Sequence, residues 1–262
     1  MISPSPVPPM PDAPPRIEVV DLDMAYGGFV VQRNLHFTVR PAEIFVVMGG
    51  SGSGKSTLLR LLIGLKAPAR GDVFYDGQSL WTADPAEREA MMRRVGVVYQ
   101  SNALWSSLTL SENVALLLEE FTDLGEPEIR DAAALKLALV GLAGFEDFYP
   151  SEVSGGMEKR AALARALALD PEILFLDEPS TGLDPINARL LDDLILDLRD
   201  GLGTTVVVVT HDLASIQAIG DNAVFLDSET KTMMAQGHPK ALLAHPPNPR
   251  VKAFLTREPI AR

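Results

Sequence analysis

Residues 44–57 read IFVVMGGSGSGKST and join an apolar run to a glycine-rich turn. The run Ile44–Met48 contains no alternating polar residues, which is typical of a strand buried on both faces. The turn fits the pattern G-x-x-x-x-G-K-[ST], which forms a phosphate-binding loop where it follows a strand and opens a helix. Helical periodicity at Lys55–Ile63 supplies that helix. The segment therefore predicts a nucleotide site, and we name residues 49–57 the phosphate loop.

The residue types of the phosphate loop suit a chain of phosphates. Glycines let backbone N–H groups approach phosphate oxygens without a Cβ in the way, and a helix N-terminus adds partial positive charge. Lys55 can reach the β- and γ-phosphates, the Ser56 hydroxyl can ligate Mg²⁺, and Thr57 can bond the α-phosphate. The residues expected to contact the nucleotide here are Gly49, Gly50, Ser51, Gly52, Ser53, Gly54, Lys55, Ser56 and Thr57.

Three further apolar runs predict strands of the same kind: Val95–Tyr99, Ile173–Leu176 and Val206–Val209. Strands buried on both faces belong to a mainly parallel sheet that helices cover. The other helices that the pattern predicts around this sheet are Met157–Leu169, Pro185–Leu198 and Leu213–Ile219. The sequence therefore predicts an α/β fold with a parallel sheet at its core.

A polar side chain follows each of these three runs. Gln100 follows the first, Asp177 and Glu178 follow the second, and His211 comes just after the third. Because ligands of open parallel sheets bind outside the carboxyl ends of the strands, we expect these groups to converge on the phosphate loop. Glu178 can accept a proton from the attacking water, and His211 would reach the γ-phosphate. The predicted ligands of Mg²⁺ and its water are Ser56, Gln100 and Asp177.

A second glycine-rich helix start lies at Ser154, Gly155 and Gly156. A hydroxyl and two glycines before a helix also suit an anion. Since one chain already has a complete phosphate loop, two interpretations stay open. Either this is an ordinary capped helix, or the chain forms a two-fold dimer in which Ser154 faces the nucleotide of the partner.

The segments around the sheet divide the chain. Residues 1–16 hold seven of the 20 prolines, so we predict a disordered tail there; a proline-rich recognition segment is the alternative. Between residues 101 and 154, helical periodicity at Glu112–Phe121 and Glu128–Val140 predicts a helical insertion. Residues 17–240 are predicted as the main domain, and residues 241–262 as a C-terminal helical tail.

The composition argues against other kinds of site. The chain of 262 residues has 23 Lys and Arg, 35 Asp and Glu and no Cys, for a formal net charge of −12. Without Cys there is no disulfide, thiolate metal site or Cys nucleophile. The acidic balance and the absence of a basic stripe disfavour binding to nucleic acid. The longest apolar runs are far shorter than the roughly 20 residues of a membrane-spanning helix, so we expect that the chain does not cross a bilayer by itself. The acidic balance favours a soluble cytosolic surface.

Taken together, these motifs resemble the ATP-binding cassette (ABC) ATPases over residues 17–240. The matching elements are the phosphate loop, Gln100, a signature at Val153–Met157, Asp177–Glu178, a D-loop at Thr181–Asp184, and His211 as switch histidine. The resemblance implies a P-loop NTPase fold with a parallel core, an antiparallel β region and a helical subdomain at 101–154. It also implies ATP and Mg²⁺ as ligands, Tyr26 stacking on adenine, and a head-to-tail dimer in which Ser154, Gly155, Gly156 and Asp184 contribute to the nucleotide sites. Val153 and Met157 depart from the commonest signature, which points to a subfamily.

Three stretches, 100–105, 154–166 and 248–255, are similar to the ATPase subunits of Mla/Mce-type phospholipid transport systems. That resemblance implies phospholipid transport powered by ATP hydrolysis, membrane permease partners and a lipid-binding Mce-type subunit. It places the chain in the cytoplasm, at the inner face of the plasma membrane. Apolar groups at Leu104, Trp105, Leu108 and Leu110 are candidates for the permease contact or for internal packing. The alternatives are the ATPase of another ABC importer or exporter, and a soluble ATPase of the iron–sulfur assembly type. A guanine-reading Asn-Lys-x-Asp element, which a GTP switch would need, is absent from the sequence.

Overall fold

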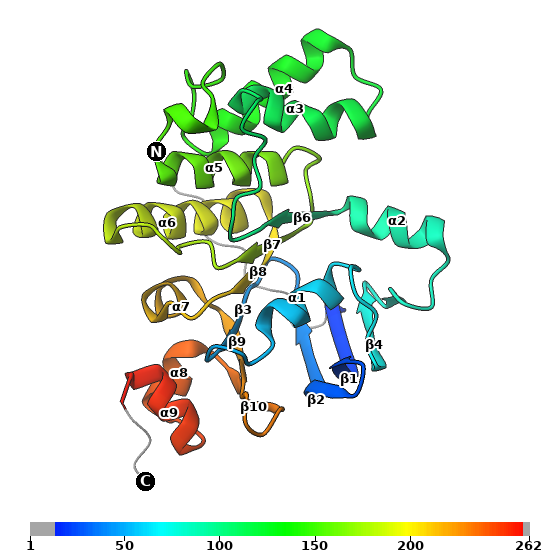
Figure 1. Cartoon of the computed structure of the whole chain (residues 1–262), viewed down its shortest axis with the longest axis vertical. Coiled ribbons are helices and arrows are strands. Elements are labelled where there is room, and N and C mark those ends of the chain that lie inside the picture. The colour runs from blue at the N-terminus through cyan, green and yellow to red at the C-terminus, as the bar shows by residue number, and fades with distance from the viewer. Residues whose placement is uncertain (1–13, 259–262) are drawn as a thin grey trace.

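A six-stranded sheet lies at the centre of the computed structural model, which describes residues 14–258 (Figure 1). The strand order is β10-β9-β3-β8-β7-β6; all neighbours pair in parallel except β10 and β9. The strands are β3 (Ile44–Gly49), β6 (Val95–Val98), β7 (Ile173–Asp177), β8 (Thr205–Val209), β9 (Asn222–Leu226) and β10 (Met233–Gly237). The four apolar runs are thus four neighbouring strands, and the predicted parallel core is confirmed.

A second sheet is antiparallel and has the order β2-β1-β4-β5. Its strands are β1 (Ile17–Tyr26), β2 (Phe29–Val39), β4 (Arg70–Tyr75) and β5 (Gln78–Ser79). Apolar residues of both sheets enclose α1 (Lys55–Leu62), whose four leucines are buried, and Phe37 of β2 stacks on Phe45 of β3 with ring centroids 5.1 Å apart. The helix that carries the phosphate loop is therefore fixed from two sides.

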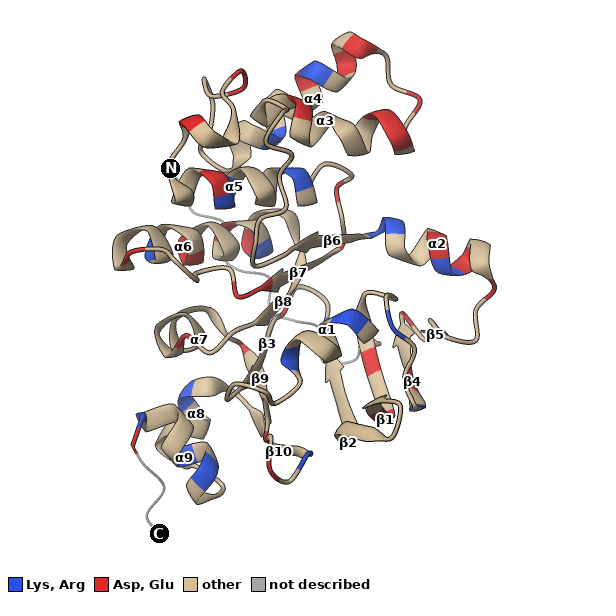
Figure 2. Cartoon of the chain, in the orientation of Figure 1, with Lys and Arg blue, Asp and Glu red and all other residues tan. Residues whose placement is uncertain are grey.

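Most of the remaining helices cover the other face and one end of the central sheet. In Figure 1, α5 and α6 lie beside the sheet, and α3 and α4 lie beyond α5. The helices are α2 (Pro85–Arg93), α3 (Leu110–Phe121), α4 (Glu126–Leu139), α5 (Gly155–Ala166), α6 (Pro185–Leu202), α7 (Leu213–Ile219), α8 (Pro239–Ala244) and α9 (Pro249–Thr256), with a 3₁₀ turn η1 at Pro150–Glu152. Within residues 14–258, no helix is long and apolar enough to cross a bilayer. Figure 2 shows acidic and basic residues interspersed along α2 and α6.

The boundaries of two helices differ from the predicted boundaries because capping residues set where a helix begins or ends. α5 begins at Gly155, two residues early, because the Ser154 hydroxyl accepts the Met157 N–H and caps the helix. α6 continues to Leu202, where Gly203 ends it in the left-handed region with φ 68°. Helix α2 was not expected from the apolar pattern, although Asp84 and Glu87 form a capping box around Pro85 at its start.

The C-terminal segment is part of the folded core. The predicted boundary at residue 241 falls inside α8, and Val251 and Leu255 of α9 are buried against the sheet residues Val46 and Phe225. At the other end, residues 1–13 of the predicted disordered tail lie outside the described residues. Arg16, also assigned to that tail, donates its N–H to the Val39 carbonyl and so extends β1.

We predict that Leu255→Ala lowers the free energy of unfolding by about 2–4 kcal/mol, because it removes a buried side chain from the cluster that α9 forms with the sheet. Urea unfolding followed by circular dichroism measures this change. The matched control is Lys252→Ala on the exposed face of α9, which should change the free energy by less than about 0.5 kcal/mol. Equal effects of the two substitutions would contradict the assignment of α9 to the core.

Candidate nucleotide site

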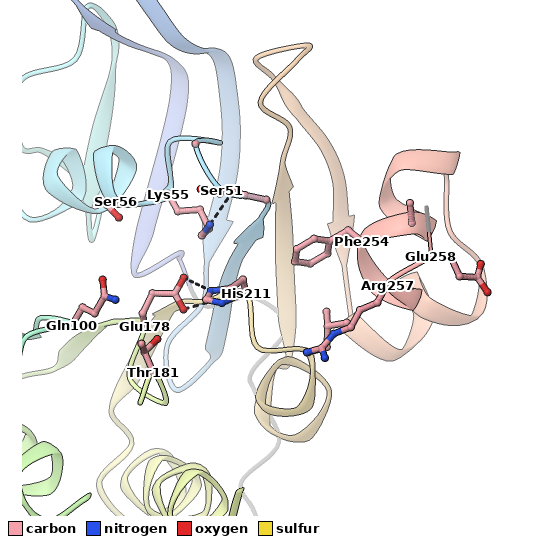
Figure 3. Close-up of a pocket in the computed structure, with 14 residues that line it drawn as sticks. Ser51, Lys55, Ser56, Gln100, Glu178, Thr181, His211, Phe254, Arg257 and Glu258 are labelled. Carbon is pink, nitrogen blue, oxygen red and sulfur yellow. Dashed lines mark hydrogen bonds and ion pairs between the residues drawn. The ribbon is translucent and has the colours of Figure 1, made fainter. Parts of the chain in front are cut away.

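A cavity of about 930 Å³ opens at the carboxyl edge of the central sheet (Figure 3). The phosphate loop, Gln100, Glu178 and His211 share its wall, so the structure brings together groups that the sequence analysis expected to converge. Its lining residues are Gly50, Ser51, Gly52, Lys55, Ser56, Gln100, Glu178, Thr181, His211, Leu213, Ala253, Phe254, Arg257 and Glu258. The four residues from the end of α9 and beyond form a wall that the motifs did not predict.

Two positions of the phosphate loop require glycine. Gly54 has φ 90°, and a Cβ there would lie 2.5 Å from Cγ1 of Val31. A Cβ on Gly49 would lie 2.4 Å from the carbonyl oxygen of Leu226. The loop therefore lies so close to β2 and β9 that only glycine fits at these two positions.

Lys55 folds back over the phosphate loop. Its Nζ donates to the carbonyl oxygens of Gly49 at 2.9 Å and Gly50 at 3.1 Å. Burial lowers the pKa of Lys55, and the carboxylates of Glu178 and Asp177 oppose that effect. A lysine held between loop and carboxylates is placed to meet the terminal phosphates of a nucleotide.

Gln32 is a supporting residue that the sequence analysis missed. It lies on β2 and is fully buried, and its Nε2 donates to the carbonyl oxygens of Ser53 and Asp227, both at 2.8 Å. The amide therefore ties the phosphate loop to the end of β9. A polar residue directly after Val30-Val31 in a strand was the available signal, and periodicity alone does not assign it a partner.

Glu178 and His211 are in direct contact. The Nδ1 atom of His211 lies 2.8 Å from Oε1 of Glu178, and the Thr210 hydroxyl donates to Oε2 at 3.2 Å. Glu178 has φ 48°, a left-handed backbone that costs on the order of 1 kcal/mol for such a residue. Its N–H donates to the Val209 carbonyl at 2.7 Å, which holds the strained backbone in place. The arrangement points the carboxylate into the cavity.

Asp177 fits the expected magnesium chemistry. Its Oδ1 is buried and has no hydrogen-bond partner among residues 14–258, and burial raises the pKa of Asp177, with the Glu178 charge adding to the effect. An unpaired buried carboxylate oxygen is costly unless it meets a ligand. Oxygen donors such as Asp177, the Ser56 hydroxyl and the Gln100 amide suit the hard Mg²⁺ ion and its water shell. These residues therefore fit the cation.

Tyr26 lies at the end of β1, outside the residues that line the cavity, and 47% of it is exposed. The Thr57 hydroxyl lowers the pKa of Tyr26, and Nζ of Lys66 lies 4.3 Å from the centre of its ring. The tyrosine is thus next to the far end of the phosphate loop, which leaves an aromatic face beside the place expected for an α-phosphate.

The signature residues and Asp184 do not reach the cavity of their own chain. Ser154, Gly155 and Gly156 open α5, and Asp184 caps α6 by accepting the N–H groups of Ile186 and Asn187. The two helix starts are neighbours, since a Cβ on Gly156 would lie 3.0 Å from Oδ1 of Asn187. They form a separate edge of the molecule that carries no triphosphate-binding loop.

The apolar group after Gln100 is only partly exposed. Trp105 is 62% exposed, and Asn113 fixes its backbone by accepting its N–H at 2.7 Å and donating to its carbonyl at 3.0 Å. Leu104 and Leu108 are half-buried, whereas Leu110 is fully buried in the core. Of the two interpretations left open for these residues, internal packing applies to Leu110, because it is the first residue of α3 and faces inward.

The family profile described as "ABC transporter" matches residues 32–181, which include the phosphate loop, Gln100, the signature and Glu178. The chain belongs to the ABC transporter family. It is an ATP-binding and ATP-hydrolysing cassette of that family, and the P-loop fold expected from the sequence is confirmed.

Several curated relatives are similar to this ABC ATPase over most of its length. "Intermembrane phospholipid transport system ATP-binding protein MlaF" of Escherichia coli K12 is 39% identical over 91% of the chain and 88% of the relative. MlaF of Haemophilus influenzae is 40% identical over 87% of the chain and 85% of the relative. The "probable ribonucleotide transport ATP-binding protein mkl" of Mycobacterium tuberculosis is also 39% identical, over 91% of the chain and 66% of the relative.

Solved structures of similar fold are also ABC cassettes. CbiO1 of Clostridium perfringens, part of the ABC transporter complex cbiONQ, has a TM-score of 0.81 at 27% identity and covers 88% of this chain and 91% of its own. A bacterial ABC transporter cassette solved as a dimer has a TM-score of 0.77 at 30% identity. The match covers 85% of this chain and 98% of that cassette.

Lys55→Ala should weaken ATP binding by at least about tenfold, because it removes the cation that faces the terminal phosphates. Isothermal titration with ATP measures the dissociation constant. Lys240→Ala, an exposed lysine on α8, serves as the control and should bind ATP like the parent protein. Unchanged affinity in the Lys55 variant would contradict the assignment of the phosphate loop.

Proposed function

We propose that this ABC ATPase powers phospholipid transport through a membrane permease. The similarity to two MlaF proteins over nearly the whole chain carries the proposal. The stretches at 100–105, 154–166 and 248–255, noted from the sequence, support the same subfamily. The mycobacterial relative is also 39% identical and is named for ribonucleotides, and the molecule carried by the purified assembly distinguishes the two substrate classes.

The site supports a hydrolytic role for each group. The phosphate loop and Lys55 bind the triphosphate, and Ser56, Gln100 and Asp177 would hold Mg²⁺ with its water. Bound Mg²⁺ neutralises charge on the phosphate oxygens. Glu178 orients the attacking water and accepts its proton, since its carboxylate enters the cavity on a constrained backbone. The contact with His211 and Thr210 fixes the direction of that carboxylate.

A second copy of the chain would complete each nucleotide site. Support comes from the position of Ser154, Gly155, Gly156 and Asp184, which lie outside the cavity of their own chain. Similar cassettes have been solved as dimers, one of them bound to ADP and Pi. A head-to-tail dimer would bring the hydroxyl and N-terminal amides of α5 to the nucleotide held by the partner, where a helix N-terminus stabilises phosphate.

The exposed Trp105 supports a permease contact. A large aromatic side chain on a backbone that Asn113 holds rigid can bury substantial apolar area in a partner with little loss of conformational entropy. We extend the proposal to a peripheral position at the inner face of the membrane, with a lipid-binding Mce-type subunit in the same assembly.

Replacing Glu178 by Gln should leave ATP affinity within about twofold and slow hydrolysis by at least about 100-fold, since the amide cannot accept the proton of water. Phosphate release measures turnover, and size exclusion with ATP shows whether the variant accumulates as a dimer. Glu119→Gln, on the exposed face of α3, is the matched control and should keep full activity. Wild-type turnover in the Glu178 variant would remove this residue from its proposed role.

Trp105→Ala should reduce co-purification of the permease from solubilised membranes by at least about fivefold, while ATP affinity is retained. Phe29→Ala removes an equally exposed aromatic ring from the antiparallel sheet and controls for general apolar surface. Mass spectrometry of the purified assembly identifies what it carries. Bound phospholipid supports the proposal; an assembly that lacks a permease, or that carries a non-lipid substrate, contradicts it.

A further inference from the structure

Asp192 is a buried acid that the proposed hydrolysis does not use. It lies on α6, where Leu191, Ile195 and Leu198 are also buried, and only 6% of it is exposed. The hydroxyl of Ser215 on α7 donates a hydrogen bond to this carboxylate, with Oγ 3.0 Å from Oδ2. Burial raises the pKa of Asp192 to about 6. Burying an ionisable side chain is unfavourable, and residues with a perturbed pKa are common at functional sites. Asp192 is therefore a candidate for a functional role.

The charges that act on Asp192 come from two helices. Arg189 and Asp193 flank it on α6, and Asp212 acts on it from the start of α7. Strand β8, which also packs on α6, contains only Thr and Val. The basic side chains of α5 do not face Asp192. Lys159 and Arg165 donate to oxygens of residues 100–103, and Arg160 donates to the carbonyl oxygens of residues 140 and 141. Asp212 is thus the charged group outside α6 that acts on Asp192.

Ser215 joins the two acids. Its Oγ lies 3.0 Å from Oδ2 of Asp192 and 3.3 Å from Oδ2 of Asp212, yet its hydroxyl has one hydrogen to donate. When Asp192 is ionised, it accepts that hydrogen. When Asp192 is protonated, it donates to the Ser215 oxygen, and the Ser215 hydrogen turns to Asp212. The protonation of Asp192 therefore changes the number of hydrogen bonds that Asp212 accepts.

Asp212 in turn holds the loop beside Glu178. Its Oδ1 accepts the Ala214 N–H and caps α7, and its Oδ2 accepts the Ser180 hydroxyl at 3.2 Å. Its own N–H donates at 3.0 Å to the Thr210 hydroxyl oxygen, which donates to Glu178. Polar contacts thus connect Asp192 through Ser215 and Asp212 to Thr210 and the carboxylate in the cavity, and the Ser215 hydrogen decides whether the link to Asp212 is made. His211 projects from the same turn.

We propose that Asp192 is a positioning residue for ATP hydrolysis, which acts through Ser215 and Asp212 on the turn that presents Thr210 and His211 to Glu178. This proposal rests on the proposed role of Glu178. Asp192 is not among the residues that line the nucleotide cavity, so its state affects turnover and leaves ATP affinity unchanged. Asp192 lies on α6, which begins at Asp184, so one helix carries both this residue and the edge expected to face a second copy.

The test compares Asp192→Asn with the parent protein at two pH values. Asparagine donates a hydrogen bond at every pH and so imitates protonated Asp192. The kcat of the variant should match the parent at about pH 5 and fall to about one third of it or less at about pH 8, with ATP affinity within twofold at both. Asp193→Asn makes the same charge change one residue along, on a half-exposed side chain, and should follow the parent at both pH values.

Ser215→Ala provides an independent variant that keeps Asp192. It breaks the link, so the ratio of its kcat to that of the parent should also change between the two pH values. In the double variant the two effects should not add, because both interrupt one pathway. Thermal melts confirm that each variant is folded.

A ratio of kcat values that stays constant between the two pH values, for either variant, overturns the proposal by reducing Asp192 to a structural role. So do additive effects in the double variant. Glu178→Gln separates the two proposals: if it is inactive while the Asp192 ratio is constant, only the positioning role fails. If Glu178→Gln turns over normally, the proposed hydrolytic role fails as well.

Discussion

The pairing of β7 with β8 is the interaction on which the site depends. In this register Asp177 lies opposite Val209, so the chain leaves both strands at the same level and Glu178 meets Thr210 and His211. The Glu178 N–H continues the ladder by one bond to Val209, although its backbone has turned left-handed. A slip of one residue would turn every side chain of one strand to its other face and would separate these groups. Close packing opposes such a slip, because the apolar residues of both strands are almost completely enclosed and side chains of different shape would have to exchange places.

A second constraint comes from the layer between the two sheets. α1 is buried there, and the phosphate loop at its start is held by close contacts to β2 and β9 and by the amide of Gln32. The loop therefore presents its backbone amides from a rigid support. Preorganised amides stabilise anionic oxygens without rearrangement when charge develops on them.

The sequence was sufficient to predict the parallel core and the convergence of polar residues on one cavity because both follow from local patterns. Apolar runs without alternation mark strands with two buried faces, and the polar residue after each run lies at the shared carboxyl edge. Gln32 and the hydrogen-bonded path through Ser215 could not be predicted, since they depend on side chains far apart in sequence that meet only after folding. The same reason explains Leu110: its exposure depends on how α3 packs against the rest of the helical segment.

The end of the chain has a structural role that motif comparison overlooks. The family match stops at residue 181, whereas Phe254 and Arg257 line the same cavity as Lys55 and His211. A fragment cut at the limits of that match would lose not only three strands of the central sheet but also one wall of this cavity. In this chain, the shielding of the cavity from water therefore depends on the last turn of α9, which lies outside the family match.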